Sequence, residues 1–176
     1  MPTAVHRMSV EEFGALPEHL TQFCELRDGE VVHMAPPKHR HVKIQDRIFD
    51  ALADVCRPFG KVRVEMPFAL NGFDLREADV GVASWARWNA IDDDGYLSGA
   101  PDLVIEVLSA SNTTAEMLER EARCLSNGCV EFWTANPIDQ TIRVATASTV
   151  RIYPLGDEVT SNLFPGWSVP VAQLFA

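Results

Sequence analysis

Hydrophobic residues recur along the chain in two rhythms, one typical of helices and one typical of strands. Apolar residues spaced three or four apart over 39–57 predict a long amphipathic helix, which Pro58 ends. A period of two over 62–68, and short runs at 77–83 and 130–134, predict strands.

Turn residues separate these elements. Asp28-Gly29 lies between alternating runs at 23–27 and 30–34, which predicts an N-terminal β-hairpin. Gly128 is placed to end a helix predicted over about 112–127. Shorter elements are predicted by similar signals: a helix at 9–16, a hairpin at 141–146 and 150–153, and a short helix at 170–175. The order of elements predicts an α/β (α+β) fold around a mixed sheet.

The central stretch 101–109 predicts a buried strand whose apolar run is interrupted by one carboxylate, Glu106. Burying an ionised carboxylate is costly unless it is paired or binds a cation. Asp79 lies near the start of another predicted strand, at 77–83. Acids on neighbouring strands indicate a divalent-metal site. The alternatives are a polar residue at a strand start for Asp79 and an ion pair with an arginine for Glu106.

Other acids fit a metal site less well. Asp102 shares a strand face with Glu106, two pleats away, but a carboxylate at the solvated start of a strand is the simpler interpretation. The run Asp92-Asp93-Asp94 falls in a polar stretch at 85–99 and lacks the spacing of a calcium-binding loop, so we expect a solvated loop.

Length and composition predict one domain spanning 1–176. The net charge of −10 argues against an extended basic nucleic-acid surface, although it leaves room for a local one. No apolar run is long enough to span a membrane, and the first seven residues lack the apolar centre of a signal peptide. We therefore expect a cytoplasmic protein without membrane partners. No pair of its four cysteines forms a C-x-x-C motif, so buried thiols are expected.

Taken together, the segments resemble the Uma family of bacterial restriction endonucleases, within the PD-(D/E)XK nuclease superfamily. The resemblance covers nearly the whole chain. Its motifs are 25–31 with Pro36-Pro37, His41, Glu65, 76–80, 101–109, 128–133 and 165–170.

The resemblance implies a restriction-endonuclease-like core, with a mixed central sheet flanked by helices. It implies that Asp79 and Glu106, with the main-chain carbonyl of Val107, hold Mg²⁺ or Mn²⁺. It also implies DNA as the substrate, cleaved by phosphodiester hydrolysis that leaves a 5′-phosphate.

The chain departs from the family pattern at the basic residue of the site. Leu108 stands where the superfamily usually has lysine, and the resemblance places the shifted basic residue in the next helix, at Arg120. Arginine keeps the charge and can pair with phosphate oxygens, but it does not readily deprotonate. Two functions stay open: a metal-dependent endonuclease with Arg120 as a catalytic residue, or an impaired nuclease-fold protein that binds or regulates, as a homodimer in one version. The chain also departs from the family pattern at Ala78, which stands in place of a proline before the first acid. That proline has a structural role, so its loss says less about activity than the loss of the lysine.

The helix at 112–127 gives a second view of Arg120. Its apolar stripe is predicted at Ala115, Leu118, Ala122 and Leu125, and Arg120 lies almost opposite. If that stripe faces the sheet, Arg120 points to solvent.

Three further residues are auxiliary candidates. Glu65 either joins the site or pairs with Arg63 or Arg76. His41 and Gln45, one turn apart, either line the path of a phosphate or are ordinary helix residues. The basic cluster around His41 is too small to establish nucleic-acid binding; it comprises His39, Arg40, His41, Lys43 and Arg47.

Overall fold

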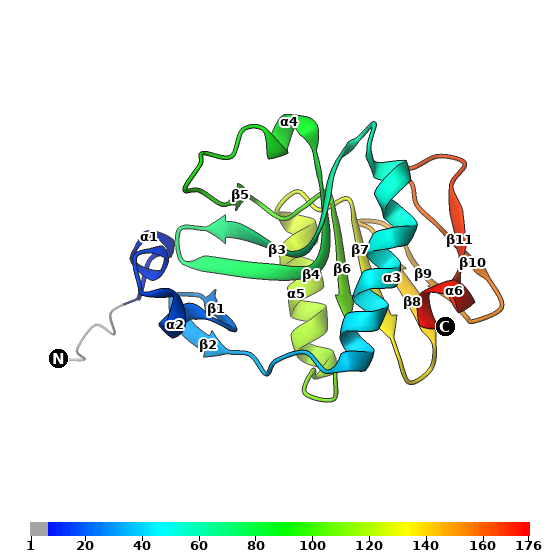
Figure 1. The fold of residues 1–176 in the computed structure, drawn as a ribbon, viewed down its shortest axis with the longest axis horizontal. Helices are drawn as coiled ribbons and strands as arrows, with labels where there is room; N and C mark the ends of the chain where they lie inside the picture. The colour runs from blue at the N-terminus through cyan, green and yellow to red at the C-terminus, as the bar shows by residue number, and fades with distance from the viewer. Residues whose placement is uncertain (1–6) are drawn as a thin grey trace.

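A mixed sheet with helices on both faces forms the centre of the structure (Figure 1). The computed structural model describes residues 7–176. Residues 1–6, within the stretch that lacks a signal-peptide centre, lie outside the described residues.

The helices are α1 Val10–Gly14, α2 Glu18–Thr21, α3 His39–Cys56, α4 Trp85–Trp88, α5 Thr114–Ser126 and α6 Val171–Phe175. The strands are β1 Cys24–Arg27, β2 Glu30–His33, β3 Gly60–Asn71, β4 Asp74–Ser84, β5 Leu97–Ser98, β6 Leu103–Val107, β7 Glu131–Asn136, β8 Thr141–Ala145, β9 Val150–Tyr153, β10 Glu158–Thr160 and β11 Ser168–Pro170. Among these helices of the described residues, none combines the length and the apolar character that crossing a membrane requires.

Within residues 7–176, nine strands form one sheet in which β2-β1-β4-β6-β7-β8-β9 are successive neighbours. β3 pairs with β4 and with the short β5, and β10 and β11 form a separate pair. The strands predicted to carry Asp79 and Glu106 side by side, β4 and β6, are therefore confirmed as neighbours, as is the hairpin β1–β2.

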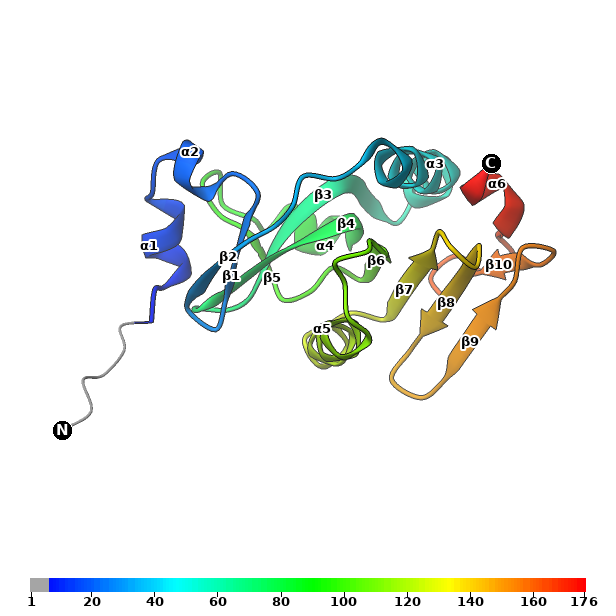
Figure 2. The same cartoon turned by 90° about the horizontal axis from the view of Figure 1, so that it is seen from below.

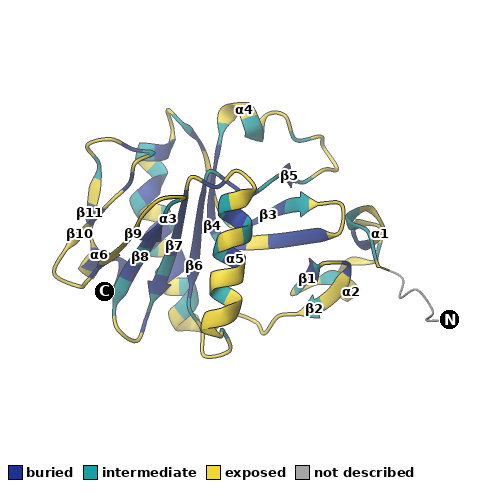
Figure 3. Cartoon of the chain, turned by 180° about the vertical axis from the view of Figure 1, so that it is seen from behind, coloured by how far each residue is buried: buried dark blue, intermediate teal, exposed yellow. Residues whose placement is uncertain are grey.

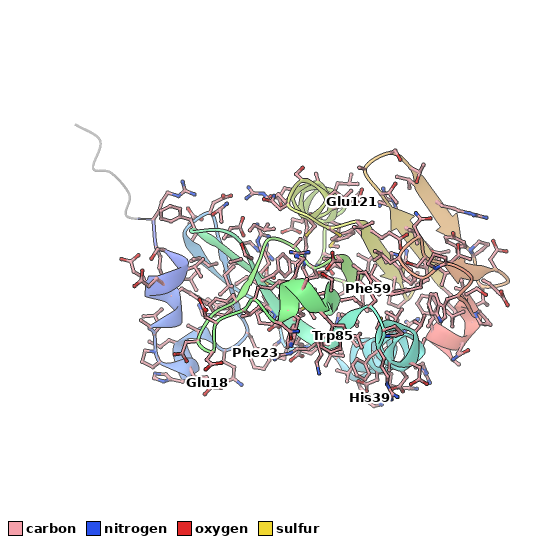
Figure 4. The ribbon with its side chains drawn as sticks, turned by 90° about the horizontal axis from the view of Figure 1, so that it is seen from above. Glu18, Phe23, His39, Phe59, Trp85 and Glu121 are labelled. Carbon is pink, nitrogen blue, oxygen red and sulfur yellow. The ribbon has the colours of Figure 1, made fainter. Side chains whose placement is uncertain are left out.

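The long helices cover opposite faces of this sheet, as Figure 2 shows. In Figure 4, His39 marks the start of α3 on one side, and Glu121 marks α5 on the other. The core on the α3 side includes Ile44, Ile48 and Leu52. The core on the α5 side includes Cys124 and Phe132. The predicted mixed sheet flanked by helices is confirmed.

Strand alternation in β6 decides which side chains meet which helix. Leu103, Ile105 and Val107 belong to the core on the α3 side, whereas Val104 belongs to the core on the α5 side. Because side chains alternate along a strand, Glu106 points with Val104 toward α5.

The buried face of α5 differs from the apolar stripe that the sequence predicts, and that prediction is wrong. Leu118 is 50% exposed, whereas Arg120 is only 7% exposed and shares the inward face with Met117 and Cys124. Figure 3 shows that the outer face of α5 is largely exposed. The charge of Arg120 is tolerated there because carboxylates meet it, as described below.

The polar stretch at 85–99 contains more regular structure than expected. It includes the single helical turn α4 and the two-residue strand β5, which pairs with β3 at Phe68 and Ala69. Asp92, Asp93 and Asp94 are exposed, in agreement with a solvated loop.

The close packing of β3 against β4 can be tested at Gly81. A Cβ at Gly81 would lie 2.8 Å from Met66 Sδ and 2.9 Å from Met66 Cβ. We expect Gly81→Ala to lower the free energy of unfolding by ~1–3 kcal/mol, because the crowded core must shift. Gly72→Ala is the control, since a Cβ at Gly72 meets nothing within 4 Å. Urea unfolding that gives equal losses for both variants would contradict this packing.

Candidate active site

The two acids predicted from the sequence lie where β4 and β6 separate. The pairing of these strands ends at Val80 and Ile105. The next residues along each strand, Asp79 and Glu106, stand just beyond the last pair. β4 then continues beside β1, where Leu75 faces Leu26. The site is therefore built at a fork between neighbouring strands.

Asp79 is held by main-chain and side-chain groups from β6 and α3. Val107 N–H donates to Asp79 Oδ2 at 2.7 Å, in place of a ladder hydrogen bond. His41 Nε2 lies 3.1 Å from Asp79 Oδ1, and Gln45 Nε2 donates to the Asp79 carbonyl at 2.9 Å. The structure thus brings both auxiliary candidates of α3 to the first acid.

Glu65 lies on β3, opposite Asp79 on β4, at a position where the pairing of the two strands is interrupted. The β3–β4 pairing skips this position, and Glu65 has a φ of +50°. Val62 contacts the core on the α3 side and Met66 the core on the α5 side, so β3 changes face here. A positive φ at a non-glycine residue is strained and often marks a functional segment.

The side chain of Glu65 is exposed, and its two proposed ion pairs are not found in residues 7–176. Arg76 instead forms a buried ion pair with Asp74. A role for Glu65 in the site stays a prediction.

Glu106 is buried and faces α5. Its Oε1 accepts a hydrogen bond from Arg120 Nε at 3.0 Å. No group in residues 7–176 donates a hydrogen bond to the other oxygen, Oε2. Every fully buried side-chain oxygen in those residues has a partner, so the unpartnered Oε2 of Glu106 must be in contact with solvent. Burial raises the pKa of Glu106, Asp79 and Glu25 raise it further, and Arg120 opposes the rise.

Arg120 is enclosed by oxygens from three strands. Besides the Glu106 contact, its Nη1 donates to Glu25 Oε1 at 2.8 Å and to Oε2 at 3.1 Å. Its Nη2 donates to the carbonyl of Glu77. Burial alone would lower the pKa of Arg120, but Glu106 and Glu25 outweigh it and raise that pKa. The expectation of a solvent-facing Arg120 is therefore wrong.

Glu25, in the hairpin, is a site neighbour that the sequence analysis did not single out. Its Oε1 accepts from Glu77 N–H at 3.0 Å, and its Oε2 accepts from Arg27 Nε at 3.0 Å and Nη2 at 2.8 Å. Burial raises the pKa of Glu25, but Arg120, the Glu77 amide and Arg27 outweigh this and lower the pKa to about 2. The available signal was an acid inside a short strand that carries the family resemblance.

Asp102 lies apart from this cluster, at the opposite end of β6. Its Oδ2 accepts from Ser84 N–H at 2.8 Å and lies 3.4 Å from Arg87 Nη1. These contacts give it a structural task, but its side chain is only 15% exposed, so the expected solvated position is wrong.

Most of the cysteines lie in the core. Cys56, Cys124 and Cys129 are buried, as predicted, and Cys24 is partly buried. Burial raises the pKa of Cys56 and of Cys124 to about 12, which keeps both as thiols.

The donors at the fork suit a hard divalent cation. Asp79 and Glu106 supply carboxylates and Val107 a carbonyl, whereas no group of three or more His, Cys, Asp or Glu in residues 7–176 is arranged to hold a metal. Magnesium is commonly bound by one or two carboxylates and keeps several waters, so this small set fits it. The open Oε2 of Glu106 is consistent with such a role.

Comparison with known families now identifies the class of protein. The Uma2 family, described as "Putative restriction endonuclease", matches residues 10–172, so the chain belongs to this family. The resemblance predicted from the sequence is confirmed, and the membership supports a nuclease function.

A solved structure shares the fold. It is described as a "putative nuclease belonging to DUF820" from Anabaena variabilis ATCC 29413. It is similar to this chain with a TM-score of 0.80 and 21% sequence identity, covering 96% of this chain and 97% of that one. A search of curated proteins found no match.

The pKa of Glu25 predicts a pH-dependent contribution to stability. Its folded pKa of about 2 lies below its ordinary value of 4.5, so ionised Glu25 stabilises the fold above about pH 4.5 and loses this effect as pH falls toward 2. We expect the free energy of unfolding of the wild type to exceed that of Glu25→Gln by ~3 kcal/mol at pH 6 and by ~1 kcal/mol at pH 3. Urea unfolding at both pH values measures this; a constant difference would contradict it.

Proposed function

We propose that the chain is a metal-dependent DNA endonuclease that hydrolyses phosphodiester bonds. Asp79, Glu106 and the Val107 carbonyl would hold Mg²⁺ or Mn²⁺. One observation carries the proposal: the two acids stand side by side just beyond the last paired residues of neighbouring strands, Val80 and Ile105, and Asp79 is hydrogen-bonded to the main chain at Val107. Family membership supports the same class of reaction.

The protein's own contribution would be to fix the acids before a cation arrives. Val107 N–H and His41 each contact one oxygen of Asp79, which limits the rotation of its carboxylate. Arg120 restrains one oxygen of Glu106 and leaves the other open. When bound, a divalent cation polarises a scissile phosphate and lowers the pKa of a bound water.

Arg120 would act as a fixed cation beside the reacting phosphate. Its guanidinium stays charged at any working pH, so it can stabilise developing negative charge but is a poor base. His41, on the first turn of α3, would face the approaching phosphate beside Asp79. Gln45 would act through the main chain of Asp79, and Glu65 would stand at the edge of the site.

Binding to DNA would have to be local, because the chain carries a net charge of −10. The start of α3 offers the basic side chains His39, Arg40 and Lys43 next to His41. A cytoplasmic location and a homodimer remain predictions from the sequence.

A second function is favoured by the contacts of Arg120. Its Nε, Nη1 and Nη2 all donate to protein oxygens, and its side chain is 8% exposed. An arginine held in this way has little freedom to reach a substrate. The alternative is an impaired nuclease-fold protein that binds or regulates without turnover.

The metal site can be tested by calorimetry. We expect Asp79→Asn to abolish measurable Mn²⁺ binding, because the cation loses one of its two carboxylates, while the fold is retained. Asp102→Asn is the matched control, since Asp102 lies at the far end of β6 and contacts Ser84 and Arg87. Unchanged Mn²⁺ affinity in Asp79→Asn would rule out this site.

Cleavage of single- and double-stranded DNA with Mg²⁺ or Mn²⁺ separates the two functions. For the endonuclease, we expect Glu106→Gln and Arg120→Ala each to lower the rate by ~10²-fold or more, and Arg120→Lys to preserve or raise it. Mn²⁺ binding without cleavage in the wild type, and activity appearing in Arg120→Lys, would instead support the impaired protein. Equal rates in wild type, Arg120→Lys and Arg120→Ala would remove Arg120 from the mechanism.

A further inference from the structure

Glu25 approaches the site from outside the strands that carry the two acids. It lies on β1, in the hairpin that precedes α3, yet its carboxylate contacts the same guanidinium as Glu106. Its side chain is 6% exposed. A buried acid that contacts the basic residue of the site, but neither candidate metal-binding acid, needs its own explanation.

Both oxygens of Glu25 are fixed by groups other than Arg120. Its Oε1 accepts from the main-chain N–H of Glu77, and its Oε2 accepts from Arg27 through two nitrogens. The carboxylate therefore stands at a set position relative to β4, two residues before Asp79. Arg27 also balances its charge, so the pairs Glu25–Arg27 and Glu106–Arg120 sum to zero.

This fixed carboxylate, together with the Glu77 carbonyl, determines how Arg120 meets Glu106. Arginine commonly binds a carboxylate with two parallel hydrogen bonds, which occupy both oxygens. Here Arg120 gives only its Nε to Glu106, because Nη2, the nitrogen on the same side as the Nε–H, is held by the Glu77 carbonyl, while Glu25 holds Nη1 on the other side and so fixes the orientation of the guanidinium. The second oxygen of Glu106 is left open as a result.

We infer that Glu25 is a positioning residue, which holds Arg120 in single contact with Glu106 and so keeps Glu106 Oε2 available to a cation. Without Glu25, only the Glu77 carbonyl holds the guanidinium away, so Nη2 turns toward Glu106 and competes with the metal for its second oxygen. The positioning of Arg120 by Glu25 is independent of the proposed endonuclease function. Only its consequence for metal binding rests on that proposed function.

Mn²⁺ titration calorimetry provides the first test, using wild type, Glu25→Gln, Arg120→Ala and the double variant. We expect Glu25→Gln to weaken Mn²⁺ binding by about 10- to 100-fold, the range seen when a residue supporting a metal ligand is lost. In the Arg120→Ala background, the same change should have no effect, since no guanidinium remains to be held. An equal loss in both backgrounds, or no loss in either, would overturn the inference.

Glu131→Gln is the matched control for general destabilisation. Glu131 is a second buried acid with several donors, namely Trp133 Nε1, Ser161 Oγ and Asn162 N–H, and it has no contact with Arg120. We expect its Mn²⁺ affinity to equal that of wild type. A loss equal to that of Glu25→Gln would make the effect one of stability alone and overturn the inference. Glu25→Asp, whose shorter side chain retracts from Arg120, replaces Glu25→Gln if the latter does not fold.

A second readout does not depend on metal or activity. The Nε–H of Arg120 is buried against Glu106, and its NMR signal can be assigned by its absence in Arg120→Lys. We expect this signal to shift in Glu25→Gln and to stay in place in Glu131→Gln. An unchanged signal in Glu25→Gln would overturn the inference. A wild type that binds no Mn²⁺, yet shows the expected shift, would refute the proposed metal site and leave Glu25 as the residue that positions Arg120.

Discussion

The guanidinium of Arg120 is the charge around which the site is assembled. A cation buried to this degree is stable only where opposite charges and hydrogen-bond acceptors surround it. Glu106 on β6, Glu25 on β1 and the Glu77 carbonyl on β4 supply them. One side chain of α5 thus joins the hairpin, the central strands β4 and β6, and the helix layer.

Much of the fold could be predicted because its signals are local. The Asp-Gly turn, the helical spacing of α3 and the apolar run of β6 each act within a few residues, and the structure has all of them. The inward face of α5 could not be predicted in this way. Its helix buries an arginine, whose partners lie 14 and 95 residues away in the sequence. No hydrophobic pattern within the helix carries that information.

The same distinction explains the site. Glu106 could be singled out because a lone acid in an apolar strand is an anomaly in one short segment, and the family resemblance then pointed to Asp79 as its partner. Glu25 gave no such anomaly, since a charged residue is ordinary in a two-stranded hairpin. Its importance arises from β1 docking beside β4 and beneath α5, where an acid that could face water instead faces Arg120.

The contact between Glu25 of the hairpin and Arg120 of α5 also affects when the site can form during synthesis of the chain. The Glu25–Arg120 bridge joins residues 95 apart in the sequence, and closing so long a loop has an entropic cost. During synthesis from the N-terminus, β1 and both candidate metal-binding acids emerge before the arginine that organises them. A growing chain therefore carries the acids of the site without its geometry until α5 has been made. Assembly order alone would delay the formation of an ordered site on the ribosome.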